Sequence, residues 1–183
     1  MQKIIFYHES REAQLLSLLL KNLSAQYAVT LLGESKVMTV GVGSELLLCE
    51  ATDLHRVEAP DTILVFSEHC LPPTELCIDA SVICIASSDN AALLKLLATT
   101  HARVITCGMS DKDTVNCSGK SEHSISVSLQ REFINCIGQR LEPLELVLSF
   151  ENGYRSYELL AYATILLLLG VVCECPKAEI SLR

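Results

Sequence analysis

The chain has 183 residues, of which 50% are apolar and 20% charged, and this balance excludes an intrinsically disordered protein. Its 14 lysines and arginines against 22 aspartates and glutamates give a net charge of −8, with no basic cluster. That charge argues against nucleic acid or an anionic membrane as a partner, because both require clustered positive side chains.

The chain opens with a short apolar run that predicts a buried strand over residues 3–7, followed by a leucine-rich helix over residues 11–25. In α/β nucleotide-binding proteins, the turn between these two elements holds the phosphates. Here the turn at residues 8–11 reads His-Glu-Ser-Arg, with no glycine and no lysine. The start therefore looks like a nucleotide-binding scaffold without its phosphate-binding loop.

Short strands are predicted next, over residues 27–32, 36–42 and 45–51, with glycines between them. Residues 61–66 and 81–86 are almost continuously apolar. Such runs are typical of a parallel sheet that is covered on both faces. This part of the chain therefore predicts the centre of an α/β fold.

Ser88 and Asp89 are predicted to cap a helix over residues 90–99, and residues 101–108 form the next predicted strand. After Gly108 the pattern changes to short runs separated by polar turns, several of them alternating. These runs, which predict a small antiparallel sheet, cover residues 113–118, 123–128, 133–138 and 144–150.

A turn at residues 151–153 leads to an apolar helix over residues 154–172. Its uncharged stretch, residues 159–173, is shorter than the roughly 20 residues that span a bilayer, so we expect a core helix. The tail, residues 175–183, is expected to be peripheral.

The sequence predicts a single α/β domain with a mostly parallel main sheet flanked by helices and a small antiparallel subsidiary sheet. The parallel part is expected over residues 1–110, the antiparallel sheet over residues 111–150 and the closing helix over residues 151–175.

Nine cysteines, an odd number, are spread through apolar runs and do not look like a disulfide framework. The sevenfold spacing of Cys70, Cys77 and Cys84 and the close pair Cys173 and Cys175 do not make a recognisable zinc site, so we interpret all of them as plain thiols. We expect a reducing, cytoplasmic compartment and no signal peptide.

Four segments in this order resemble the central domain of the Mur ligase family: residues 45–54, 61–71, 85–108 and 153–170. The resemblance implies a fold of the kind found in enzymes that use ATP and magnesium to join an amino acid or peptide to a carboxylate. The departures from the family pattern fall on the chemistry. The family's Gly-Lys-Thr phosphate loop, expected at about residues 8–13, is absent.

Further departures follow downstream. The family's His-Asn pair is replaced by Arg155 and Ser156, and its second asparagine by Leu159. Its doubled aspartate is reduced to Ser88 and Asp89. The family's two flanking domains have no room in 183 residues.

The resemblance implies a metal role for Glu50, at the position of a glutamate that helps to hold magnesium, and for His69 in the family's metal loop. The alternative is that both are ordinary surface residues. The turn offers a helix N-terminus and Arg11 to an anion, whereas Glu9 and Glu12 would repel one. The predicted ligand-binding residues are His8, Ser10, Arg11, Glu50, Asp53, Ser88 and Asp89, with Ser67 added where the strand ends form a crevice.

The favoured hypothesis is a non-catalytic Mur ligase-like module for binding or assembly, with no catalytic residue, no expected cofactor, and ATP and magnesium not expected to bind. The alternative is a domain that binds, or acts on, a small metabolite in the crevice at the carboxyl ends of its parallel strands. A subunit that depends on an unknown protein partner, or that self-associates, is a third hypothesis.

Overall fold

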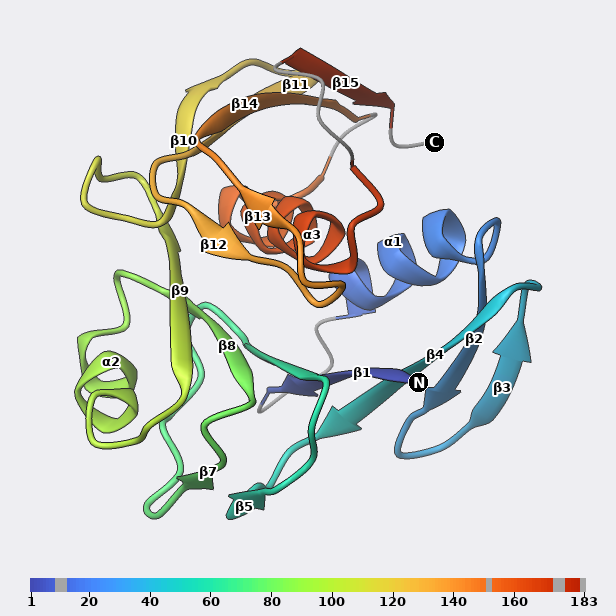
Figure 1. Cartoon of the computed structure of the whole chain (residues 1–183), viewed down its shortest axis with the longest axis vertical. Helices are drawn as coiled ribbons and strands as arrows, with labels where there is room; N and C mark the ends of the chain where they lie inside the picture. Colours follow the sequence, from blue (N-terminus) through green and yellow to red (C-terminus); the bar gives the residue numbers. More distant parts are fainter. Residues whose placement is uncertain (9–12, 151–152, 173–176, 182–183) are drawn as a thin grey trace. The chain divides into compact units, whose positions relative to one another are not determined.

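The computed structural model describes residues 1–8, 13–150, 153–172 and 177–181. The chain forms two compact units, residues 1–104 and residues 105–183 (Figure 1). Over the described ranges, three helices, a mostly parallel sheet and a smaller antiparallel part confirm the predicted α/β class. That the whole chain acts as a single domain stays a prediction.

The first unit is built on a sheet in the order β3–β2–β4–β1–β6–β8. Within this sheet β3 alone is antiparallel to its neighbour, β2. Two short strands, β5 and β7, pair separately. The elements are β1 (Gln2–Tyr7), α1 (Ala13–Leu23), β2 (Tyr27–Leu32), β3 (Val37–Val40), β4 (Ser44–Ala51), β5 (Arg56–Val57), β6 (Thr62–Phe66), β7 (Cys77–Ile78), β8 (Ile83–Ser87) and α2 (Ala91–Leu97).

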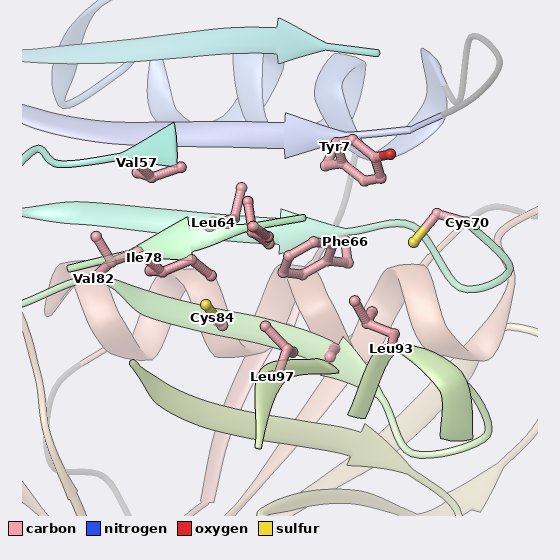
Figure 2. Packing of buried hydrophobic residues seen from close by; sticks show 12 residues of the cluster. Tyr7, Val57, Leu64, Phe66, Cys70, Ile78, Val82, Cys84, Leu93 and Leu97 are labelled. Carbon is pink, nitrogen blue, oxygen red and sulfur yellow. The ribbon is translucent and has the colours of Figure 1, made fainter. Parts of the chain in front are cut away.

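The core of the first unit lies around the central strands, because every residue of β6 and β8 is buried. Leu64 and Phe66 share one face of β6, and Leu93 and Leu97 of α2 belong to the same cluster (Figure 2). The ring of Tyr7 meets Phe66 edge to face, with centroids 5.7 Å apart. Each fully buried leucine or phenylalanine contributes roughly 1.5–3 kcal/mol, so the apolar runs themselves hold these strand ends in place.

The second unit has the strand order β9–β10–β11–β14–β15, in which β11 is antiparallel to both of its neighbours, β10 and β14. This is the predicted antiparallel sheet. Its elements are β9 (Arg103–Gly108, which starts at the division between the units), β10 (Val115–Lys120), β11 (Ser124–Leu129), β12 (Phe133–Ile134), β13 (Arg140–Leu141), β14 (Leu144–Ser149), α3 (Ser156–Leu169) and β15 (Lys177–Ser181).

Helix α3 is the core of the second unit and contacts β10, β11 and β14. Every residue from Tyr157 to Leu169 is buried, which confirms the predicted core helix. Its end is fixed by Gly170 in the left-handed conformation and by a hydrogen bond from Cys136 N–H to Leu168 C=O of 2.8 Å. Within the described residues, no helix is long and apolar enough to cross a membrane.

Two local expectations need correction. The tail is not merely peripheral, because residues 177–181 form β15 and pair with β14. The run at 133–138 is a strand only over Phe133–Ile134. The rest turns back because Asn135 Oδ1 accepts hydrogen bonds from the N–H groups of Ile137 and Gln139. The predicted turn at 151–153 falls mostly outside the described residues.

Candidate functional site

The candidate site lies where β1, β4, β6 and β8 of the first unit end. These strands are parallel, so their carboxyl ends meet at one edge of the sheet. The end of β1 is fixed on both sides: His8 N–H donates to Ala51 C=O at 3.1 Å, and Ser67 N–H donates to Tyr7 C=O at 3.0 Å. The first residue after β1 therefore has a defined position.

His8 and Glu50 face each other at this edge. Phe6 lies opposite Glu50 in the register, and His8, two residues beyond Phe6, points to the same face as Phe6. Nε2 of His8 is 3.6 Å from Oε1 of Glu50, with 6% of the histidine side chain and 16% of the glutamate side chain exposed. The pair is thus a largely buried polar contact at the carboxyl ends of β1 and β4.

The other nitrogen of His8 has a different environment. Nδ1 is buried and has no hydrogen-bond partner among the residues that the structure describes. A buried polar atom without a partner costs roughly 1–3 kcal/mol. An arriving ligand group that hydrogen-bonds Nδ1 would recover that free energy.

Gly33 makes room for the Glu50 carboxylate. It follows β2, and the register β2–β4 places it beside Glu50. A Cβ atom built on Gly33 would overlap Oε2 of Glu50. The sequence interpretation missed this role, because it treated Gly33 only as a break between strands.

The Glu50 carboxylate also affects the neighbouring thiol of Cys49. Burial, and to a lesser degree the neighbouring carboxylate, raise the pKa of its thiol above the ordinary value. Both effects disfavour the thiolate, so this cysteine is a poor nucleophile where it stands.

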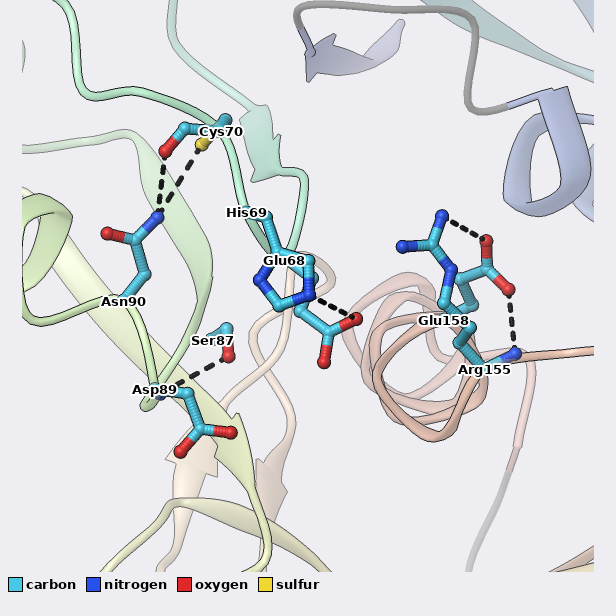
Figure 3. Close-up of polar contacts among 8 residues, drawn as sticks. All are labelled: Glu68, His69, Cys70, Ser87, Asp89, Asn90, Arg155 and Glu158. Atoms are coloured by element: carbon cyan, nitrogen blue, oxygen red, sulfur yellow. Dashed lines mark hydrogen bonds and ion pairs between the residues drawn. The ribbon is translucent and has the colours of Figure 1, made fainter.

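The ends of β6 and β8 carry a second set of polar contacts (Figure 3). Asn90 Nδ2 donates to Cys70 C=O at 2.9 Å, while its Oδ1 accepts from Leu93 N–H at 3.1 Å. Asn90 is therefore the N-cap of α2, which corrects the prediction that Ser88 and Asp89 cap it. One asparagine both starts the helix and ties it to the loop after β6.

The remaining predicted residues are spread out. Asp53 is 79% exposed and pairs with His55 at 3.3 Å. Asp89 is exposed, with its N–H donating to Ser87 Oγ at 3.3 Å. Ser88 is only partly exposed, and Ser10 and Arg11 lie outside the described residues. Of the predicted set, the structure brings His8 and Glu50 together.

Glu50 and His69, the two residues predicted to bind a metal, each contact a different residue. Glu50 faces His8, whereas Nε2 of His69 lies 3.7 Å from Oε2 of Glu68 and its side chain is 76% exposed. Within the described part of the chain, no three His, Cys, Asp or Glu side chains form a group that could hold a metal. A metal on Glu50 and His69 stays a prediction.

In the second unit, Arg155 and Ser156, which were predicted to replace the family's His-Asn pair, stand at the start of α3. Arg155 N–H donates to Oε2 of the buried Glu158 at 2.9 Å, and the Arg155 guanidinium lies 3.6 Å from Oε1 (Figure 3). Lys120 Nζ donates to Ser156 Oγ at 3.1 Å. These contacts engage the N-cap N–H and the side chains of Arg155, Ser156 and Glu158 from within the protein.

The fold is similar to two solved structures. One is the UDP-N-acetylmuramate:L-alanyl-γ-D-glutamyl-meso-diaminopimelate ligase from Neisseria meningitides, with a TM-score of 0.54 and 12% identity over 92% of this chain and 61% of that chain. The other is a murein peptide ligase from Psychrobacter arcticus, with a TM-score of 0.58 and 7% identity over 96% of this chain and 44% of that chain.

These similarities confirm the predicted Mur ligase-like fold and extend no further, because the identities are very low. The chain also spans less than two thirds of either ligase. No protein-family model matches the sequence, and neither does any curated protein sequence.

Proposed function

We propose that this chain is a Mur ligase-like module that has lost ligase chemistry and serves in binding or assembly. The observation that carries the proposal is the contact between His8 and Glu50. Glu50 stands where the sequence resemblance implies a magnesium-holding glutamate. Here one carboxylate oxygen faces a buried histidine and the other lies against Gly33.

Charge supports the same proposal. A triphosphate carries about four negative charges and normally binds to a cradle of backbone N–H groups with a lysine. At the matching turn this chain has His8, Glu9, Ser10 and Arg11, and the whole chain carries −8. A magnesium ion on Glu50 would also have to displace or compete with the His8 side chain.

The start of α3 supports it from the second unit. The Arg155 N–H and guanidinium are both engaged with Glu158, and Ser156 Oγ with Lys120. Side chains that complete a helix end have less capacity to bind a nucleotide.

Isothermal titration calorimetry with ATP and magnesium chloride tests this proposal. We expect no heat beyond dilution for this chain, whereas a protein of known affinity for the magnesium nucleotide, measured in the same buffer, serves as the positive control. Tight, saturable binding of the magnesium nucleotide would overturn the proposal.

A second candidate function rests on Nδ1 of His8, for which the described part of the chain offers no hydrogen-bond partner. A small metabolite with a hydroxyl, amine or carboxylate could bind at the carboxyl ends of the strands and complete that hydrogen bond. A thermal-shift screen of metabolites against the wild type and His8→Gln tests it. The expected hit stabilises the wild type and loses its effect in the variant; a screen without hits removes this candidate.

The compartment belongs to the proposal as well. The thiols of Cys84 and Cys107 are buried and their pKa values are raised to about 12, so they behave as apolar core residues and not as redox centres. We propose a reducing, cytoplasmic setting because all the described cysteines are free.

A further inference from the structure

Strand β3 forms an edge of the first unit's sheet (Figure 1). Its apolar side chains are exposed or partly exposed. Val37 is 71% exposed and Met38 37% exposed. Edge strands of natural proteins are commonly protected by charges, by proline or by a covering element. Within Val37–Val40 there is no charge and no proline.

The backbone of β3 presents its hydrogen-bonding groups outward at two residues. Gly33 N–H donates to Lys36 C=O at 2.9 Å, so these two residues form a hydrogen-bonded pair. Pairs alternate along an antiparallel ladder, and the register then makes Leu32–Val37 and Thr30–Thr39 non-hydrogen-bonded pairs. The N–H and C=O groups of Val37 and Thr39 therefore point away from β2.

We propose that this edge is an assembly surface at which β3 of a second copy of the chain adds as an antiparallel strand. A two-fold axis through Met38 pairs Val37 of each copy with Thr39 of the other. All the outward backbone groups of Val37 and Thr39 then exchange hydrogen bonds across the axis, because residues 37 and 39 are equally spaced about residue 38.

The side chains fit this register. Met38 lies opposite the buried Leu31, on the core face, and would contact Met38 of the second copy at the axis. On the other face, Val37 sits beside the exposed Leu32 and would lie opposite Thr39 of the second copy. β-Branched residues facing each other across strands are favourable, at roughly 0.2–1 kcal/mol a pair.

Local charge also favours a second copy at this place. The segment 33–44 contains one glutamate and one lysine and is neutral, although the chain as a whole carries −8. Two copies repel each other least through a neutral segment, and salt should strengthen the association by screening the remaining repulsion. One short strand buries much less than a standard interface, so the dimer should be weak.

Sedimentation velocity over a range of protein and salt concentrations tests the proposal. We expect a reversible dimer whose fraction increases with protein concentration and with salt concentration. Val37→Lys should abolish this dimer. Met109→Lys is the matched control, since Met109 is 64% exposed in the second unit and the change adds the same charge. A wild type that stays monomeric throughout, or a Val37→Lys protein that dimerises like the wild type, would overturn the proposal.

Cross-linking tests the register directly. At a non-hydrogen-bonded pair the two Cα atoms are about 4.5 Å apart, within the range of a disulfide. Met38→Cys should therefore give a disulfide dimer under mild oxidation. Thr39→Cys should not form this disulfide, because residue 39 of one copy lies diagonally across from residue 39 of the other, at about 7–8 Å. Equal cross-linking of the two variants contradicts the two-fold register; ATP binding, by contrast, would contradict only the proposed loss of ligase chemistry.

Discussion

Two largely buried carboxylates, Glu50 at the end of a strand and Glu158 at the start of a helix, have very different surroundings. Glu158, in the second unit, accepts a hydrogen bond from Arg155 N–H and pairs with its guanidinium, so it completes a helix start. Glu50, in the first unit, faces a histidine at 3.6 Å whose other nitrogen has no described partner. A glutamate can therefore complete the start of a helix, as Glu158 does, or lie beside a polar atom that a ligand could bind, as Glu50 does.

The largest expected effect tests whether the two units also differ in their hydrophobic cores. Cys84, in the first unit, and Cys107, in the second, both have pKa values raised by burial from 9.0 to about 12. The folded state holds these protons more tightly, so their contribution to stability is complete below pH 9 and is lost as the pH rises toward 12. Between these pH values, each thiol should lower the free energy of unfolding by about 1.4 kcal/mol per pH unit.

Urea unfolding at a series of alkaline pH values measures this slope. Cys84→Ala and Cys107→Ala should each flatten it by a similar amount, because the two cores are alike in this respect. A slope unchanged by either substitution would show that other groups, such as Tyr162 with its own raised pKa, dominate alkaline unfolding.

The next effect measures the contrast itself. Glu158→Ala removes the acceptor for Arg155 N–H and the buried end of an ion pair, and should destabilise the protein by about 2–3 kcal/mol. Glu50→Ala breaks only a long contact with His8 and should cost less than about 1 kcal/mol. Equal losses in chemical unfolding would mean that Glu50 is also a structural residue.

A smaller effect concerns the space beside Glu50. Gly33→Ala pushes the carboxylate away, whereas a Cβ at Gly119, in β10, meets nothing within 4 Å. We expect Gly33→Ala to be less stable than Gly119→Ala by about 1 kcal/mol, since both variants share the gain from restricting the unfolded chain. In a Glu50→Ala background the penalty at Gly33 should vanish; if it persists, the clash lies elsewhere.

The smallest effect is chemical. Glu50→Gln removes the lesser of the two causes that raise the pKa of Cys49, so its alkylation rate near neutral pH should increase modestly. Peptide mass spectrometry of the alkylated protein measures the rate for each cysteine, with the exposed Cys77 as the internal standard. A large acceleration would instead indicate that the substitution opens the strand end.

The sequence predicted much of the fold because hydrophobic runs are local signals. The strands at 27–32 and 61–66 and the buried helix near 154–172 all follow from apolar patterns. The pairing of β15 with β14 was not predicted, because strand partners are set by contacts between distant segments. Asn90 was missed as the helix cap because Ser88 and Asp89 are equally good capping types.

The site was predicted in part for the same reason. His8 and Glu50 were both named, since each stands at a strand end, but their contact depends on the register between β1 and β4. A shift of one residue would have turned one of them to the other face. The proximity of Gly33 to the Glu50 carboxylate likewise could not be predicted from the sequence, because seventeen positions separate the two residues.

Helix α3 has a consequence for biosynthesis. The strands that it contacts, β10, β11 and β14, all precede it in the chain, and β15 follows. A ribosome therefore exports these strands before the element that shields their apolar side chains. The second unit should pass through an interval in which it depends on chaperones, and ribosome-bound chains that stop before residue 156 should be far more sensitive to protease than chains that include the helix.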